Sequence, residues 1–180
     1  MRALIVYESM YGNTRAIAEA IAEGLREHGD ADVVDVGSVS AEQVAHTDLL
    51  VVGGPTHVHG MSSTTSRRSA ADRAHEEGSE LVLEPGVPGL VGLRSWFDAM
   101  PQVRGHGTPA AAFDTRANAA LLLTGRASRG IATRLTRHGY QLVTPPESFL
   151  VDKNSHLLPG ELERATAWAR TALGPSLGAR

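Results

Sequence analysis

The sequence predicts an α/β protein built on a doubly wound, five-stranded parallel β-sheet with helices on both faces. Two observations lead to this prediction. Short runs of aliphatic residues alternate along the chain with segments whose apolar residues recur every three or four positions, the spacing of a helix face. The clearest run contains no polar residue, as expected of a strand buried on both sides of a parallel sheet. Strands that alternate with helices in this way are joined by right-handed crossovers.

The first strand and the first helix are the best-defined elements. Residues 3–7 form a continuous apolar run, which predicts a strand. From Thr14 onward apolar residues recur at helical spacing, with charged residues on the opposite face, until His28 and Gly29 supply a stop signal. The polar residues between the two elements must form a tight loop at the carboxyl end of the strand.

The same reasoning assigns the remaining elements. Further strands are predicted over residues 33–36, 49–52, 108–113 and 140–143, and further helices over residues 41–45, 127–138 and 161–173. The third strand ends at a Gly-Gly-Pro sequence, which is typical of a turn. We expect the end of the chain, residues 174–180, to be a frayed tail.

The segment between the third and fourth strands is longer than one crossover needs. Residues 90–100 carry apolar and aromatic side chains at helical spacing and are assigned as the crossover helix. Residues 67–77 predict a polar helix, and Gly and Pro interrupt the stretch that follows it. We therefore expect a single domain over residues 1–180, with a mobile or partner-dependent surface excursion at about residues 62–89.

Composition removes several classes of function. The 180 residues include no cysteine, which excludes disulfides, thiolate nucleophiles, iron–sulfur clusters and cysteine zinc sites. A net charge of −3 provides no overall basic field, so we expect no nucleic-acid partner. The early apolar run is too short for a membrane span or a signal peptide, and we expect a cytoplasmic protein with no membrane span.

The loop at residues 9–14 has the composition of an anion-binding site. Ser9 and Thr14 carry hydroxyl groups, Asn13 carries an amide, and Gly12 allows the backbone to curl towards a ligand with positive φ. Backbone N–H groups and the dipole at the start of the helix also favour a negative charge, so a phosphate fits. The Walker sequence, which needs a lysine, and the GxGxxG dinucleotide sequence are both absent.

Residues 5–21 resemble the signature of the flavodoxin family. The shared features are an aromatic residue at the end of the strand, then a hydroxyl residue, a small residue and a threonine, and finally alanine and aliphatic residues on the helix. The order of elements along the chain is similar to flavodoxin as well. The resemblance implies a flavodoxin-like strand order of 2-1-3-4-5 and FMN as the cofactor. The residues implied to bind its phosphate are Ser9, Met10, Tyr11, Gly12, Asn13 and Thr14.

Two other kinds of protein could contain such a loop. It could be a phosphate-binding or merely capped loop in another doubly wound fold. A response-regulator receiver has the same strand order, but it requires an acidic pair, a phosphoacceptor aspartate and a lysine. In this chain those places hold Glu8-Ser9, Gly53-Gly54-Pro55 and Thr144-Pro145, so the receiver is excluded.

The resemblance implies that the flavin ring lies between two loops that leave the third and fourth strands. Neither loop contains the tryptophan or tyrosine that often stacks on the ring, so His57, Val58 or His59 would have to form its face. The alternatives are a polar turn whose histidines face water, or a metal pair, for which no third ligand is evident. The residues implied to surround the ring are Pro55, Thr56, His57, Val58, His59, Gly60, Asp114, Thr115 and Arg116.

Two of these residues receive specific predictions. Arg116 could stabilise negative charge near N1 of reduced flavin, and pairing with Asp114 at the surface is the alternative. Gly60 can take both signs of φ, and the resemblance implies that its peptide bond to Met61 flips when the flavin is reduced.

Three functions are compatible with these features. We favour an electron carrier that cycles FMN between redox states and exchanges electrons with redox partner proteins. The second function is an NAD(P)H-dependent quinone or related flavin reductase, and the third is a cofactor-free module with the same fold. Arg67, Arg68 and Arg73 are expected on a solvated helix face, with docking of an acidic partner or a nicotinamide phosphate as the alternative.

Overall fold

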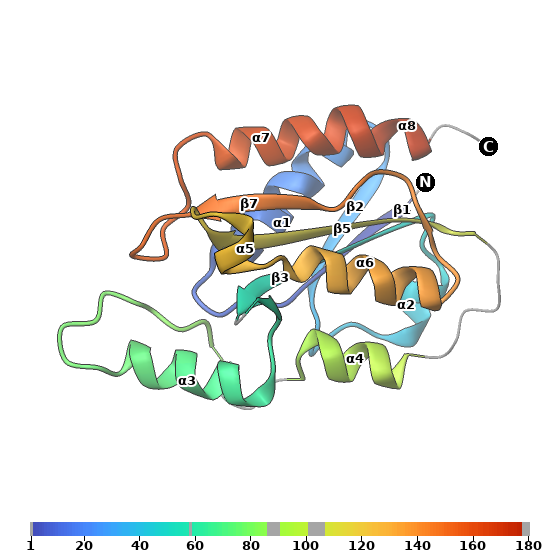
Figure 1. Cartoon of the computed structure of the whole chain (residues 1–180). Coiled ribbons are helices and arrows are strands. Elements are labelled where there is room, and N and C mark those ends of the chain that lie inside the picture. The colour runs from blue at the N-terminus through green and yellow to red at the C-terminus, as the bar shows by residue number, and fades with distance from the viewer. Residues whose placement is uncertain (1, 58, 86–90, 101–106, 178–180) are drawn as a thin grey trace.

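The computed structural model describes residues 2–57, 59–85, 91–100 and 107–177. Figure 1 shows a central sheet with helices on both faces. Its parallel strands are β1 (Arg2–Tyr7), β2 (Asp30–Asp35), β3 (Leu49–His57), β5 (Pro109–Ala117), β6 (Gln141–Leu142) and β7 (Glu147–Val151). They follow the order β2-β1-β3-β5-β6, and β7 also pairs with β5. Because β6 and β7 share the fifth position, the predicted strand order 2-1-3-4-5 is confirmed.

The fifth strand is interrupted by two prolines. Pro109 pairs with Gln141 whereas Phe113 pairs with Glu147, so the fifth strand bulges relative to β5 between these points. Pro145 and Pro146 lie in the gap, and neither has an N–H for the ladder. The sequence predicted strand only over residues 140–143, because prolines usually end a strand. β7 was missed, although it brings a further segment to the carboxyl edge of the sheet.

β3 and β5 continue beyond their predicted ends. Gly54 pairs with Asp114 and Pro55 pairs with Thr115, so residues 114–116 belong to a strand and are not the loop that the sequence predicted. The predicted loop after the third strand is likewise in part a continuation of β3 to His57. The polar composition of these residues suggested loops, but neighbouring strands supply hydrogen-bond partners whatever the side chains are.

Alternate residues of the strands face two separate cores. Ile5 and Val51 belong to one core, and Leu4 and Val52 belong to the other. On the first face the sheet is covered by α1 (Asn13–Leu25) and α7 (Glu161–Trp168). On the second face it is covered by α4 (Leu93–Ala99), α6 (Ala127–Arg137) and the short α2 (Ala41–Ala45). Both faces of the sheet are therefore buried, which leaves the ends of the strands as places for a ligand.

The chain remains helical beyond α7. A π-helical turn over Ala169–Leu173 leads into α8 (Gly174–Leu177), so the predicted frayed tail is wrong for residues 174–177, and residues 178–180 lie outside the described residues. Ala169 and Leu173 are fully buried. A Cβ on Gly174 would lie 2.3 Å from His28 Nε2, so the helix packs closely against the turn that follows α1. This tertiary contact keeps residues near the end of the chain helical, and the local sequence showed no sign of it. Among the described residues, no helix has the length and apolarity that crossing a membrane requires.

The excursion contains a well-capped helix, α3 (Thr64–Ala74). It begins earlier than residue 67, the predicted start, because Ser63 and Ser66 form a capping box. In Figure 1, α3 and the loop after it lie beyond the end of β3.

The described part of the excursion is packed on the loop at residues 9–14. The Tyr11 hydroxyl donates to the Ala70 carbonyl at 2.8 Å, and Met10, Ala70, Tyr11 and Leu83 form a small apolar cluster. Beyond α3, the Glu84 N–H donates to the Met10 carbonyl at 2.9 Å. The sequence predicted a mobile segment here, whereas residues 62–85 are anchored at several points; residues 86–89 lie outside the described residues.

Candidate functional site

A cavity of about 240 Å³ opens at the carboxyl edge of the sheet. Its walls come from the loop after β1, the ends of β3 and β5, the turn after β7 and the last turn of α3. This is the edge where open α/β sheets bind ligands. A larger groove of about 800 Å³ runs between α1 and α7, but helix-surface side chains such as Glu23 and Arg170 line it and no strand end reaches it. We therefore place the functional site in the smaller cavity.

The loop after β1 prepares the start of α1 for an anion. Gly12 has the positive φ of +86° that the sequence predicted, and it is the N-cap residue of α1, with no side chain to bond the first turn. The Gly12 N–H donates to Ser9 Oγ at 3.1 Å. Because no side chain caps the first turn of α1, its N–H groups and the helix dipole are available to a negatively charged ligand.

Thr14 connects this loop to β5. Its Oγ1 lies 2.8 Å from the Oγ1 of Thr115, and both residues are buried. One hydroxyl of such a pair donates to the other and keeps its own acceptor sites, while the second hydroxyl remains free to donate. The pair thus presents one hydroxyl proton to the cavity, which both residues line.

The turn after β7 closes the cavity opposite the loop. The Asn13 amide donates to the Ser155 carbonyl at 2.5 Å, and Ser155 has a positive φ of 63°. Asp152 Oδ1 accepts the N–H groups of Asn154 and His156, which fixes the turn. Lys153 lines the cavity within this turn. The sequence analysis missed the segment because it ended the fifth strand before the two prolines.

Of the described residues predicted to surround the flavin ring after the third strand, only those at the end of β3 line the cavity. Pro55, Thr56 and His57 line the cavity. The Thr56 Oγ1 also accepts the Ala127 N–H at 2.9 Å, and so supports the start of α6. Burial is the main cause that lowers the pKa of His57, with the charges of Arg73 and Arg67 adding to it, so the ring is neutral at pH 7.

His59 and Gly60 do not line this cavity. His59 itself has the positive φ, 69°, and forms a β-bridge with Gly125. Gly60 belongs to β4 (Gly60–Met61), which pairs with the end of β3. The described residues contain no group of three histidine or acidic side chains that could hold a metal ion. Val58 lies outside the described residues.

Asp114 and Arg116 have separate roles, and the structure does not pair them. Asp114 is fully buried, does not line the cavity, and accepts the Ser128 N–H at 2.7 Å at the start of α6. The helix dipole there favours a carboxylate, which explains its position. Arg116 lines the cavity and donates through one guanidinium nitrogen to the carbonyls of Ala117 and Ala119. Its Nε is buried and has no partner among the described residues.

The three arginines expected on a solvated face of α3 are in three different environments. Arg68 and Arg73 are exposed, as predicted. Arg67 is buried and contacts Glu8, and Arg73 also lines the cavity. The sequence could not separate them, because their surroundings depend on how α3 docks.

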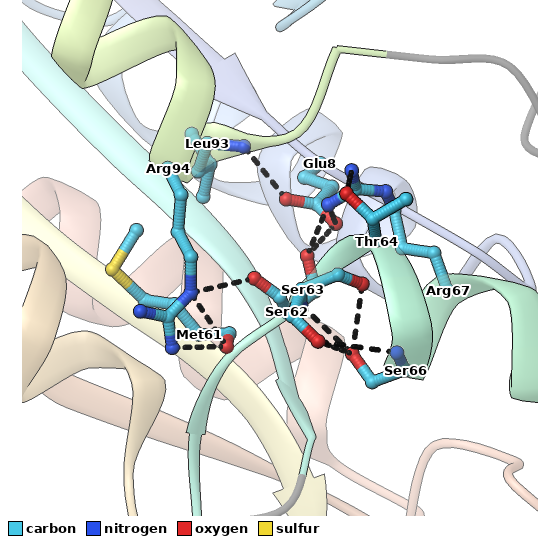
Figure 2. A network of polar contacts seen from close by, with 9 residues as sticks. All are labelled: Glu8, Met61, Ser62, Ser63, Thr64, Ser66, Arg67, Leu93 and Arg94. Carbon is cyan, nitrogen blue, oxygen red and sulfur yellow. Dashed lines mark hydrogen bonds and ion pairs between the residues drawn. The ribbon is translucent and has the colours of Figure 1, made fainter.

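A buried polar network holds α3 at the carboxyl end of β1. Figure 2 shows side-chain and backbone groups of Ser62, Arg67 and Leu93 converging on the Glu8 carboxylate. Leu93 N–H donates to Glu8 Oε2 at 2.8 Å, Ser62 Oγ donates to Oε1, and Arg67 lies 3.9 Å from Oε1. Arg94 donates to the carbonyls of Met61 and Ser62. The network therefore ties the beginnings of α3 and α4 to β1, and so positions Arg73.

These residues fit an FMN molecule bound through its phosphate. The uncapped helix start and the threonine pair offer donors at one cavity, and Arg116, whose Nε has no partner among the described residues, also lines it. Residues 5–94 match the family model for flavodoxin, and the chain belongs to the flavodoxin family. FMN is the cofactor that proteins of this family bind.

Individual relatives agree with this family. A flavodoxin from Clostridium beijerinckii is 40% identical over 50 residues, which cover 27% of this chain and 36% of the relative. The match thus spans about a third of the length of that relative. Among solved structures, an archaeal flavodoxin has a TM-score of 0.64 at 20% identity and covers 98% of this chain and 99% of its own. Flavodoxin 2 from Bacillus cereus has a TM-score of 0.65 at 18% identity, covering 99% and 98%. A WrbA-like protein from Agrobacterium tumefaciens has a TM-score of 0.60 at 20% identity and covers 99% of both chains. At these identities the solved structures establish the fold.

Proposed function

We propose that this chain binds FMN in the cavity at the carboxyl edge of the sheet and acts as an electron carrier between redox partner proteins. The observation that supports this best is the convergence of the loop at residues 9–14 with Thr115 and the unpartnered Nε of Arg116, in a member of the flavodoxin family. When bound, FMN supplies the reversible uptake of one or two electrons.

Different residues of the chain bind the two ends of the cofactor. Ser9, Asn13 and Thr14, with the N–H groups at the start of α1, bind the phosphate. Residues 55–57 and 115–117 bind the remainder, with the neutral ring of His57 as a flat wall. Asp114 is left out of this proposal because its carboxylate supports α6, and His59 and Gly60 are left out because they do not line the cavity. The peptide flip at Gly60 loses its support for the same reason.

An exposed apolar surface beside the cavity supports a protein partner. The short helix α5 (Leu121–Thr124) carries three leucines, of which Leu122 is 94% exposed. Thr124 of this helix accepts a hydrogen bond from Arg116, so the leucines stand next to the site. Contiguous exposed leucines are unfavourable in water and are common in protein–protein contacts.

The cytoplasmic location remains a prediction, which cell fractionation would test.

An NAD(P)H-dependent reductase is the second candidate. A further cavity of about 220 Å³ adjoins the first and shares Arg73, Lys153 and Ser155 with it, which leaves room for part of a second small molecule. The fold similarity to a WrbA-like protein is compatible with either function.

One set of measurements separates these functions. The purified protein should be yellow, or its apoprotein should bind added FMN with quenching of flavin fluorescence. For a carrier, NADPH alone should leave the flavin oxidised under anaerobic conditions, and dithionite should reduce it. Rapid bleaching by NADPH would instead establish the reductase. If neither the purified protein nor the apoprotein binds FMN, both proposals fail and the cofactor-free module remains.

A further inference from the structure

Besides Arg116, two basic side chains outside the signature loop reach the cavity. Arg73 comes from the last turn of α3 and Lys153 from the turn after β7, and both line the cavity together with Ser9, Asn13 and Thr14. They also share the adjoining cavity of about 220 Å³, so they stand between the two hollows. The sequence did not indicate Lys153, and it indicated Arg73 only as one of three arginines that could dock an acidic partner or a nicotinamide phosphate.

The signature loop provides no countercharge of its own. Its donors are hydroxyl, amide and backbone groups, and the nearby cation, Arg15, does not line the cavity. Arg15 lies 3.2 Å from the Glu84 carboxylate and 3.6 Å from that of Glu19. A phosphate monoester carries nearly two negative charges at pH 7. The dipole at the start of α1 offsets only about half of one charge, so fully charged side chains at the cavity would add to the binding.

Arg73 is held over the cavity by the packing of α3. The Tyr11 hydroxyl donates to the Ala70 carbonyl, and Arg67, earlier in the same helix, is anchored in the network around Glu8. After burial, the charge of Arg73 is the next cause that lowers the pKa of His57, which lines the same cavity.

Lys153 belongs to a turn that is fixed by hydrogen bonds to Asp152. Asp152 is the one acid among the described residues that line the cavity, and its carboxylate accepts backbone N–H groups and lies 3.8 Å from His156. Within the described part of the chain, neither Arg73 nor Lys153 takes part in an ion pair. The cavity is thus lined by the neutral anion-binding loop and by two cations without ion pairs, and Glu80 lines only the adjoining cavity.

We propose that Arg73 and Lys153 form a cationic clamp that supplies the countercharge for the FMN phosphate and makes the cavity select FMN over riboflavin. This inference rests on the proposed function. The two side chains of the clamp come from α3 and from the turn after β7, and both segments lie outside the signature loop. Charge-assisted contacts of this kind are stronger than the neutral contacts that the loop offers, and they weaken as salt screens the charges.

The test compares two flavins that differ only in the phosphate. Apoprotein of the wild type, Arg73→Gln, Lys153→Gln and the double variant is titrated with FMN and with riboflavin. Arg68→Gln is the matched control, because Arg68 is an exposed arginine of the same helix that does not line the cavity. We expect each clamp variant to lose about tenfold in affinity for FMN, and the double variant to lose more, with riboflavin affinity unchanged within about twofold. The wild-type preference for FMN should also fall with added salt, and the double variant should lose most of this dependence.

A second readout needs no flavin. The His57 ring is titrated by NMR, with His57→Gln to assign its signal, and its pKa should rise in Arg73→Gln but not in Arg68→Gln.

Three results would overturn the clamp. Equal losses for FMN and riboflavin would show that the two side chains only support packing, and unchanged FMN affinity would remove them from the phosphate site. An unshifted His57 pKa in Arg73→Gln would show that Arg73 does not face the cavity. A wild type that binds neither flavin would overturn the proposed function itself, which is a distinct outcome.

Discussion

Individual residues of the loop after β1 combine backbone conformation with ligand binding. Gly12 illustrates this, because its φ of +86° is unfavourable for any residue with a Cβ, while the space around it is open apart from Glu84 Oε1 at 3.5 Å from the position of a Cβ. The strain of a substitution would therefore come from the backbone conformation rather than from a clash.

Gly12→Ala should destabilise the protein by about 1–2 kcal/mol, the usual difference for a left-handed L-residue. Gly160→Ala is the matched control, because Gly160 precedes α7 with a φ of +85° and a Cβ there would meet nothing within 4 Å. Urea denaturation should show similar losses for both variants, and only Gly12→Ala should weaken FMN binding. An equal loss of FMN affinity in the two variants would show that Gly12 does not belong to the FMN site.

The threonine pair joins stability to binding in a different way. Thr14→Val is nearly isosteric but leaves the buried Thr115 hydroxyl without its partner, and it should cost about 1–3 kcal/mol of stability. It should also weaken FMN binding by about 1.5–3 kcal/mol, if the hydroxyl donates to the phosphate. Thr115→Val removes the other half of the pair and serves as the comparison, with unfolding and FMN titration measured on both. Unchanged FMN affinity in Thr14→Val would show that the phosphate is elsewhere.

Glu84 makes the stability of this region depend on pH. Burial is the largest cause that raises its pKa, Asp35 and Glu19 raise it further, and Arg15 and a hydrogen bond from Ser9 lower it. A carboxyl whose pKa is higher in the folded than in the unfolded state contributes stability that is complete below its unfolded pKa. That stability is lost as pH rises through the folded pKa.

Glu84→Gln should therefore be more stable than the wild type at pH 7 and should lose this advantage near pH 4. The control is Glu19→Gln, which removes the other, exposed partner of Arg15. Urea denaturation at the two pH values measures the difference. An advantage that persists at pH 4 would have to come from something other than ionisation of Glu84.

At the scale of elements, the position of α3 depends on the network around Glu8 rather than on an apolar face. The helix buries Arg67, Ala70 and Ala71, and its base is held by Ser62 and Arg67 against the Glu8 carboxylate. Gly92 belongs to the same contact, because a Cβ there would lie 2.1 Å from an Arg67 guanidinium nitrogen. Removing the charge of Glu8 should therefore loosen the whole excursion.

Glu8→Gln should lower stability by roughly 3 kcal/mol, because it leaves the buried Arg67 without its anion and turns an amide donor towards the donors around it. Cleavage by a protease within residues 62–85 should become faster. Glu27→Gln is the control, since Glu27 pairs with Arg170 at 2.7 Å on the exposed surface, where such pairs contribute little. A variant that resists cleavage as well as the wild type does would show that the apolar contacts of Met10 and Leu83 are enough to hold α3.

For the molecule as a whole, the two cores and the cavity are consequences of one arrangement. Residues that alternate along the strands fill cores on opposite faces, so the helices occupy both faces and the ligand is confined to the edge of the sheet. At that edge the loop after β1, the ends of β3 and β5 and the turn after β7 meet, although they are separated by up to about 140 residues in the sequence, as in the Asn13–Ser155 contact.

The sequence by itself determined the class of fold, the strand order through its resemblance, and the loop at residues 9–14. These follow from local signals, since a buried strand, an amphipathic helix and a glycine-containing loop leave their patterns in neighbouring residues. The sequence could not show that polar residues after the third and fourth strands extend those strands, nor that β7 resumes the sheet after Pro145 and Pro146.

Only the tertiary structure decided which predicted site residues meet. It separates Asp114 from Arg116, removes His59 and Gly60 from the cavity, and adds Arg73 and Lys153. The physical reason is that these outcomes depend on long-range contacts, such as the docking of α3 on Glu8 and of the turn after β7 on Asn13. Such contacts are specified by surfaces distant in sequence, and no local pattern of residues carries them.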